Sequence, residues 1–161
     1  MSRDLRADVQ ANKRRSQRLY DEIFGKGNFA AADELMAPDI VNHGPGAPPV
    51  PGTEGIKRQA ALLRTAMPDL EVILHDQVGE GDRVASRWTG RGTHAGPLNL
   101  PTGLVTATGN TISFDEIRID RHAGGRIVES WWIPDRFTLW IQLGLLPSGR
   151  PRTQRPPADL E

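Results

Sequence analysis

The sequence predicts an α+β fold, with three helices and a short strand among them, then an antiparallel meander of four strands, and a closing helix. Two observations support this order. Up to residue 67 the apolar residues recur at helical spacing, whereas between residues 70 and 133 they alternate with polar residues in the period of two that strands show. Helices that precede a run of strands, instead of alternating with them, are typical of α+β proteins.

Glycine and proline delimit the first two helices. The first is expected over Asp4–Phe24, with basic residues between its apolar positions, and Gly25 ends it. The second is short, over Phe29–Ala37, where alanine, leucine and methionine favour a helix and Pro38 closes it. A short strand is expected over Ile40–His43.

A proline-rich segment separates this strand from the third helix. Residues 44–52 hold so many prolines and glycines that neither a helix nor a central strand fits, so we expect a loop. Thr53 with Glu54 opens the third helix, which runs to about Met67 and is stopped by Pro68.

Two hairpins make up the predicted meander. The first has a four-residue connection over residues 79–82, and the second turns over residues 122–125. Between them, residues 95–109 form a long loop rich in Gly, Pro and Thr, of the kind that often acts as a lid. The predicted strands are Leu70–Val78, Arg83–His94, Thr111–Arg121 and Arg126–Ile133, and the closing helix is Phe137–Leu146. A curved sheet with helices on its concave side leaves a cavity between the layers, where small-molecule sites form.

Length and composition exclude several classes of protein. We expect one domain over residues 1–147 and a disordered Pro/Arg-rich tail over residues 148–161. Lys and Arg number 20 and so do Asp and Glu, so the net charge is zero and nucleic-acid binding is not expected. No apolar stretch approaches the roughly 18 residues of a membrane span. The absence of cysteine excludes disulfides and thiolate metal sites and fits a cytoplasmic protein.

Asp135 is the first candidate for a catalytic residue. It follows two tryptophans, Trp131 and Trp132, at the close of the last predicted strand, where Pro134 ends the ladder because it has no N–H. A carboxylate held against indole surface is poorly solvated, which raises its pKa and suits it to proton transfer at neutral pH. In the alternative interpretation Asp135 caps the closing helix, which would lower its pKa.

Two histidines join the candidate catalytic set. His94 ends a strand beside the lid, on the face of Trp88, and could polarise a carbonyl or accept a proton. His43 ends the first strand just before the proline-rich loop. A solvated loop histidine is the alternative for His94. His75 and His122 are expected to be solvated.

The candidate substrate contacts each have a structural alternative. Tyr20 lies on the inward stripe of the first helix and could be a core tyrosine. Asp115 and Glu116 are neighbours in a strand, so one of them must face inward. The candidate contacts are Tyr20, Trp88, Asp115, Trp131 and Trp132, although ordinary core packing explains any one tryptophan.

Several catalytic motifs are absent from the sequence. It has no Gly-x-Ser-x-Gly elbow, no phosphate-binding or dinucleotide glycine pattern and no His-Glu-x-x-His. The four histidines lie on four elements without metal-ligand spacing, so no metal is expected. General acid/base catalysis without a cofactor remains for an enzyme.

Short motifs across residues 14–147 resemble the SnoaL-like polyketide cyclase family, whose fold is the cone of the nuclear transport factor two-like group. The motifs are Arg-Leu-Tyr-Asp-Glu-Ile-Phe at 18–24 with Gly27-Asn28, Leu35 to His43, Gly81 to Val84, Arg87 to Gly90 with Gly92-Thr93-His94, and Gly125 to Glu129 leading to Trp131. The resemblance implies a cone-shaped curved antiparallel sheet, three N-terminal helices packed on its concave face and a short C-terminal helix.

The resemblance also implies a reaction and assigns roles to residues. Such proteins typically bind a polycyclic or ester substrate inside the cone, without a cofactor, and a carboxylate and a histidine move protons during ring closure. Many relatives carry His-Trp-Asp in the last strand where this chain reads Ser130-Trp131-Trp132, which leaves Asp135 as the matching carboxylate. His43 matches a histidine frequent in the family, family spacing favours Asp115 over Glu116, and the Tyr20 hydroxyl becomes a substrate contact.

The predicted function is therefore a cofactor-independent cyclase or isomerase, acting by general acid/base catalysis on a polyketide-like small molecule in natural-product biosynthesis. Opening of an epoxide, by a cyclase or a hydrolase, is one alternative. A small-molecule binding protein without turnover is the other. We expect the cavity between the first helix and the concave sheet, with Tyr20, Trp88, His94 and Trp132 among its walls.

A homodimer is also predicted. Antiparallel meanders leave one sheet face exposed, and the resemblance implies that a second copy covers it. The alternating positions Val84 and Trp88, and Ile117 and Ile119, give each face apolar area.

Overall fold

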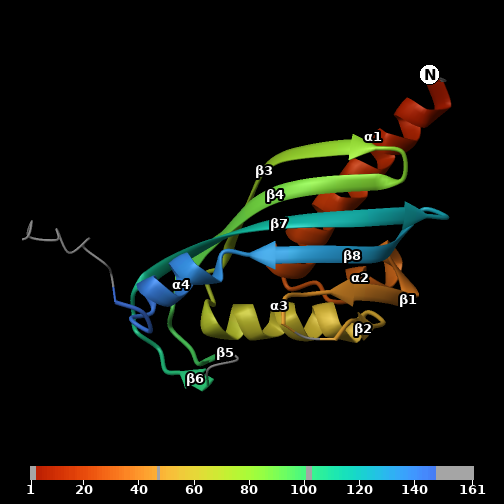
Figure 1. Cartoon of the computed structure of the whole chain (residues 1–161). Helices are drawn as coiled ribbons and strands as arrows, with labels where there is room; N and C mark the ends of the chain where they lie inside the picture. Colours follow the sequence, from red (N-terminus) through yellow and green to blue (C-terminus); the bar gives the residue numbers. More distant parts are fainter. Residues whose placement is uncertain (1–2, 47, 101–102, 148–161) are drawn as a thin grey trace, which may run out of the picture.

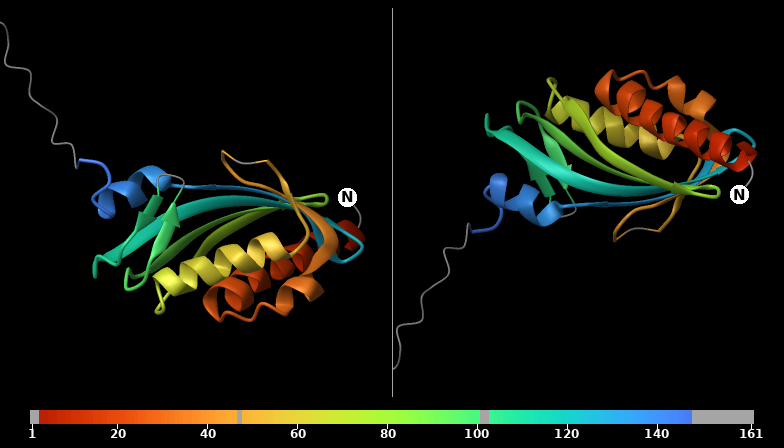
Figure 2. Two further views of the ribbon diagram at one scale, coloured as in Figure 1. Left: turned by 90° about the horizontal axis from the view of Figure 1, so that it is seen from below. Right: turned by 90° about the horizontal axis from the view of Figure 1, so that it is seen from above.

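A six-stranded sheet, covered on its concave face by helices, forms the body of the protein (Figures 1 and 2). The computed structural model describes residues 3–46, 48–100 and 103–147, so the predicted tail over residues 148–161 lies outside the described residues. The helices are α1 (Arg3–Arg18), the π-helix η1 (Leu19–Gly25), α2 (Ala31–Leu35), α3 (Glu54–Ala66) and α4 (Arg136–Gln142). The predicted fold class is confirmed.

The first helix continues from α1 into η1 and carries the largest block of the core. Leu19, Tyr20, Ile23 and Phe24 are almost completely buried against the sheet. The prediction of one helix up to Phe24 is right in extent, but its last turns widen to π geometry.

The second helix is shorter than predicted. It ends at Leu35, and the chain passes at Met36 into an extended conformation that opens β1 (Met36–His43). The helix over Phe29–Ala37 and the strand beginning at Ile40 were therefore misplaced at their shared boundary. Pro38 disfavours a helix before it, and pairing of Met36 with Ile127 in the sheet favours the strand.

The sheet has the strand order β2-β1-β8-β7-β4-β3. The four-strand antiparallel meander is confirmed, but β1 joins it by a parallel pairing with β8, and β2 falls within the segment predicted to be a loop. The strands are β2 (Val50–Pro51), β3 (Glu71–Glu80), β4 (Arg83–Thr93), β7 (Thr111–Ala123) and β8 (Arg126–Pro134).

Both hairpin turns are tighter than predicted. The strands run on until only Gly81-Asp82 and Gly124-Gly125 connect them. Gly81, Gly124 and Gly125 have φ values of 57°, 55° and 74°, in the left-handed region that glycine adopts without strain. Two-residue turns of this kind match the twist of the strands, so pairing extends to the end of the ribbon.

The segment expected to be a long loop contains a small separate hairpin, β5 (Leu98–Leu100) with β6 (Gly103–Val105). Its start is fixed to the end of α3, because the backbone N–H groups of Ala95 and Gly96 donate to the carbonyl of Ala66 at 2.9 and 3.1 Å. A side chain on Gly96 would collide with the carbonyl of Thr65, so this approach requires glycine.

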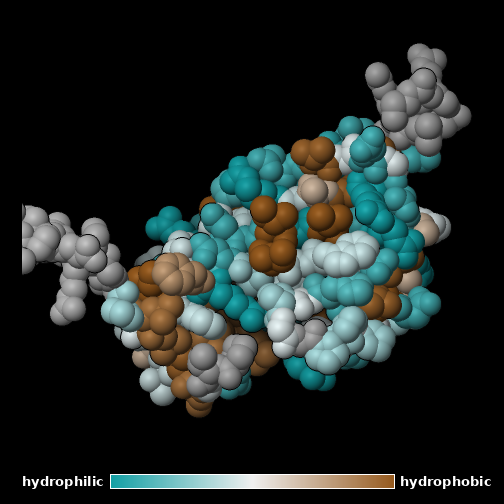
Figure 3. Space-filling view, in the orientation of Figure 1, coloured by the Kyte–Doolittle hydropathy of each residue, from teal (hydrophilic) through white to brown (hydrophobic). Residues whose placement is uncertain are grey.

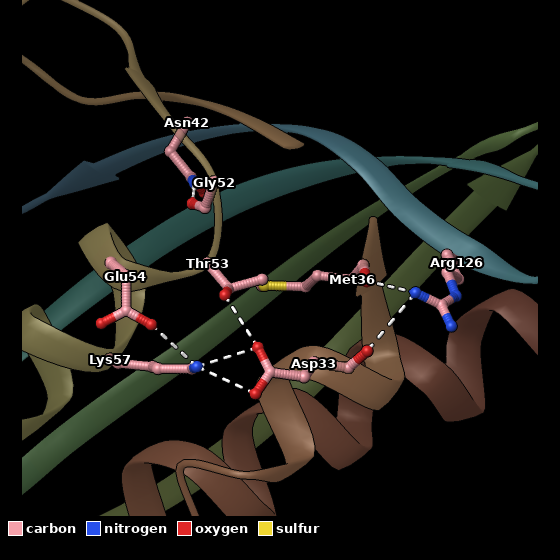
Figure 4. A network of polar contacts seen from close by, with 8 residues as sticks. All are labelled: Asp33, Met36, Asn42, Gly52, Thr53, Glu54, Lys57 and Arg126. Carbon is pink, nitrogen blue, oxygen red and sulfur yellow. Dashed lines mark hydrogen bonds and ion pairs between the residues drawn. The ribbon is translucent and has the colours of Figure 1, made fainter. Parts of the chain in front are cut away.

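A polar network fixes the start of α3 against α2 and β1 (Figure 4). Asp33 accepts hydrogen bonds of 2.9 Å from the hydroxyl of Thr53 and from Nζ of Lys57, and Arg126 donates to the carbonyls of Asp33 and Met36 at 3.4 and 3.3 Å. Thr53 occupies the expected N-cap position, but its hydroxyl binds Asp33 and caps no α3 N–H. Among the described helices, none combines the length and the apolar character that crossing a membrane requires.

Candidate functional site

A cavity of about 370 Å³ opens between α3, the concave face of the sheet and the start of α4. Most of its wall is apolar, and the polar side chains are few. The apolar side chains of the lining are Pro48, Ile56, Leu62, Leu63, Leu98, Leu100, Phe114, Trp132, Pro134 and Leu139, and the polar side chains are Asn42, Arg58, Gln59, Asn99, Glu116 and Arg136. A volume of this size suits a small organic ligand.

Strand β7 turns three of its charged side chains inward. Glu116, Arg118 and Asp120 are each at most 2% exposed, whereas Ile117 and Ile119 are 55% and 38% exposed on the opposite face. Figure 3 shows apolar side chains gathered on this outer face of the sheet. Buried charges are costly unless they are paired, so the arrangement indicates a functional face and not ordinary core packing.

Glu116 is the carboxyl group of the cavity. Its Oε1 accepts a hydrogen bond of 3.2 Å from Nε1 of Trp88, and burial raises its pKa to about 7 against the opposing effect of Arg118. A carboxyl group with such a pKa exchanges protons readily near neutral pH, which is the property expected of a general acid or base.

A second polar cluster lies deeper, on the same face of β7. Arg118 Nε donates to Asp120 Oδ1 at 2.8 Å, and Asp120 also accepts from the hydroxyls of Ser130 and Ser16 at 2.6 and 2.7 Å. Arg118 reaches Asn42 in the cavity wall through a contact of 3.5 Å. The cluster therefore holds one wall residue in place and pairs the buried charges, but Arg118 and Asp120 do not line the cavity.

His122 belongs to this cluster and not to the solvent. It is only 4% exposed, its Nε2 lies 3.2 Å from the hydroxyl of Ser16, and burial lowers its pKa. The sequence-based expectation that His122 is solvated was wrong, because β7 extends past the predicted turn and carries the side chain inward.

The two tryptophans of β8 point to opposite faces of the sheet. Trp132 lines the cavity and packs so closely on Gly44 that a side chain there would collide with its ring. Trp131 lies on the other face, stacked on His43 with ring centroids 5.1 Å apart, and His43 Nε2 is 3.0 Å from Oε1 of Glu129. The structure therefore places His43 and Trp131 away from the cavity.

Asp135 is exposed and occupies the N-cap of α4. Its Oδ1 accepts the backbone N–H of Thr138 at 3.0 Å, and this bonding holds the pKa of Asp135 below its usual value. Its neighbours Pro134 and Arg136 line the cavity, but Asp135 does not. The capping interpretation of Asp135 is the one that the geometry supports.

The remaining predicted residues divide between the core and the outer face. Tyr20, Trp88 and His94 are fully buried, and none of them lines the cavity. The prediction that the first helix forms a wall of the cavity was therefore wrong. Helix α3 forms this wall instead. His94 Nδ1 accepts the N–H of Thr108 at 3.3 Å and so ties the two ends of the lid segment together. Asp115 is exposed on the outer face, where the hydroxyl of Thr89 donates to it.

Sequence reasoning did not select Glu116, Arg58 or Arg136, which line the cavity. A signal for Glu116 was present, since it shares a face with Ile112 and Phe114 at spacing two, but the spacing of the family motif favoured Asp115. No cluster of three His, Asp or Glu side chains suited to a metal ion occurs within residues 3–46, 48–100 and 103–147.

Comparison with known proteins gives a consistent result. The profile of the family described as SnoaL-like polyketide cyclase matches residues 14–143. The solved structure of IdmH from Streptomyces antibioticus, a candidate polyketide cyclase, is 34% identical, with 83% of this chain and 98% of that chain covered and a TM-score of 0.69. A search of curated proteins found no significant match.

Two further solved structures are less similar in sequence and show the fold alone. A candidate SnoaL-like polyketide cyclase from Jannaschia sp. CCS1 is 24% identical, covers 86% of this chain and 95% of its own, and has a TM-score of 0.75. AclR from Streptomyces galilaeus, a candidate hydroxylase, is also 24% identical, with coverage of 89% and 87% and a TM-score of 0.76.

Proposed function

The chain belongs to the SnoaL-like polyketide cyclase family, and from this premise we propose that it is a cofactor-independent cyclase or isomerase acting on a polyketide-like small molecule. One observation carries the proposal. Glu116, with a pKa of about 7, lies in the wall of a largely apolar cavity of about 370 Å³. We assign the acid/base role to Glu116 instead of Asp135, because Asp135 is exposed, caps α4 and lies outside the cavity.

The proposed reaction is proton transfer followed by ring closure. The Glu116 carboxylate removes a proton from a carbon next to a substrate carbonyl, and the electron pair moves to the carbonyl oxygen to give an enolate. The amide groups of Asn42 and Gln59 line the same cavity and offer N–H donors for the enolate oxygen. The enolate carbon then attacks a second carbonyl of the substrate, and Glu116 returns the proton to the alkoxide that forms.

Epoxide opening is the second candidate, and the same residue favours it. A pKa of about 7 leaves about half of Glu116 protonated at neutral pH. In that form the carboxyl group can donate its proton to an epoxide oxygen while water, or a hydroxyl of the substrate, attacks the carbon. The two reactions require opposite protonation states of Glu116, so their pH dependence differs in sign.

The proposal is tested with substrate mimics, which are linear poly-β-ketones that carry an aromatic ring. Their turnover is followed by mass spectrometry. Glu116→Gln should lower turnover by about 10² to 10⁴, the range of general acid/base catalysis. Asp115→Asn removes the neighbouring carboxylate on the outer face and should leave turnover unchanged. Equal turnover by wild type and Glu116→Gln would remove Glu116 from the mechanism, and binding of the mimics without turnover by either would favour a binding protein.

A further inference from the structure

We infer that the substrate carries a carboxylate, which Arg58 and Arg136 bind at the cavity while the apolar lining holds the rest of the molecule. The inference rests on the proposed function and narrows its substrate class. It starts from the charged side chains that line the cavity among residues 3–46, 48–100 and 103–147, which are two arginines and Glu116.

Arg136 lies beside an aromatic ring of the cavity wall. It is the first residue of α4 and half-buried, and its guanidinium carbon lies 6.0 Å from the ring centroid of Trp132, another cavity residue. Contact with an aromatic face restricts the plane of a guanidinium group while leaving its N–H donors available. None of the ion pairs in the described part of the chain involves Arg136.

Arg58 reaches the cavity from the opposite layer. It lies on the face of α3 that also presents Gln59 and Leu62 to the cavity, and no ion pair among the described residues involves it. Its neighbour Lys57 differs, because Lys57 is paired with Asp33 and Glu54. Lys57 is therefore neutralised outside the cavity, whereas the exposed Arg58 lines the cavity and has no ion-pair partner among the described residues.

The charge balance of the cavity favours an anionic ligand. Two guanidinium groups line the cavity, and Glu116 is the only carboxyl group among its described lining residues that can offset them; burial leaves this carboxyl group protonated in part near neutral pH. Arg118 forms an ion pair with Asp120 below the cavity wall. The fork of a guanidinium group matches the two oxygens of a carboxylate, and partial exclusion of water strengthens such a contact.

Isothermal titration calorimetry with two probes of nearly equal shape tests the inference. The probes are 2-naphthoate, which carries the carboxylate, and the neutral 2-naphthamide. Wild-type protein should bind the carboxylate at least tenfold more tightly, and added salt should reduce the difference. Arg58→Gln and Arg136→Gln should each weaken 2-naphthoate binding by about 10- to 100-fold and leave 2-naphthamide binding unchanged.

Two further variants separate charge from shape and from general effects. Arg136→Lys keeps the charge without the fork and should retain part of the preference for the acid. Arg91→Gln removes an exposed arginine of β4 that does not line the cavity, and it should change neither affinity.

The outcomes also separate this inference from the proposed function. Equal affinity of wild type for both probes, or no binding of 2-naphthoate, overturns the carboxylate inference and leaves the role of Glu116 to the turnover experiment. Equal losses for both probes in the arginine variants overturn it as well, because they would indicate damage to the cavity. If wild type prefers 2-naphthoate and each arginine substitution reduces this preference, the carboxylate inference is supported. This holds even if Glu116→Gln retains full turnover.

Discussion

Trp88 and Glu116 face each other directly across β4 and β7, and the indole Nε1 donates a hydrogen bond of 3.2 Å to the carboxyl Oε1. Aromatic rings pack around the indole, with centroids of Tyr20, Phe24 and Phe114 at 5.2, 5.5 and 5.7 Å. The rings exclude water from the carboxyl group and fix the donor that it contacts. The raised pKa of Glu116 thus follows from its surroundings, with burial the largest cause.

The pH dependence of kcat/KM should identify the protonation state that acts. If Glu116 is the base of ring closure, activity rises with pH, reaches half its maximum near pH 7, and stays level above it. If Glu116 donates a proton to an epoxide, activity falls through the same pH. A profile that is flat from pH 5 to pH 9 would contradict both roles.

The stability of Glu116→Gln should depend on pH. The folded-state pKa of about 7 lies above the ordinary value of 4.5, so the folded protein binds more protons than the unfolded chain between these values, and wild-type stability falls as pH rises through this window. The glutamine variant lacks this loss and should be more stable than wild type above pH 7, by about 3 kcal/mol. Below pH 4.5 the two should unfold alike in denaturant titrations. A variant less stable than wild type at pH 8 would contradict the buried position of the charge.

Substitutions of Asp135 separate capping from catalysis. Asparagine also caps helices, so Asp135→Asn should keep both turnover and melting temperature. Asp135→Ala should lose about 1 kcal/mol of stability, because the N–H of Thr138 loses its partner. A 10²-fold loss of turnover in a stable Asp135→Asn variant would restore Asp135 as the catalytic carboxylate.

A homodimer through the outer face of the sheet is the last prediction. Ile117 and Ile133 are 55% and 70% exposed on this face, and Figure 3 shows apolar patches on the same side of the molecule. Sedimentation at micromolar concentration should show a dimer, and Ile133→Asp should shift it to monomer by placing a charge in the interface. Leu104→Asp, at an exposed position of the separate β6 hairpin, is the matched control and should stay dimeric. A monomeric wild type would overturn the prediction.

Local sequence patterns predicted which helices and strands form, but they did not predict the exact residues at which these elements end. The glycines at both hairpin turns favoured the meander, yet pairing across the ribbon extended β3 and β7 into the expected connections. The boundary between α2 and β1 was missed for the same reason, since Met36 pairs with a residue about 90 positions later in the chain. Hydrogen bonds between distant segments outweigh helix propensity at such positions.

The sequence alone determined that the chain is α+β, that its strands form a meander, and that one of Asp115 and Glu116 faces inward. Only the tertiary structure decided which one. The period of two defines two faces of a strand but does not say which face the helices cover, and on β7 the apolar Ile117 and Ile119 lie on the uncovered face. Packing of α1, η1 and α3 on the concave side selected the face of Glu116, sealed Tyr20 and His94 in the core, and left the cavity beside α3.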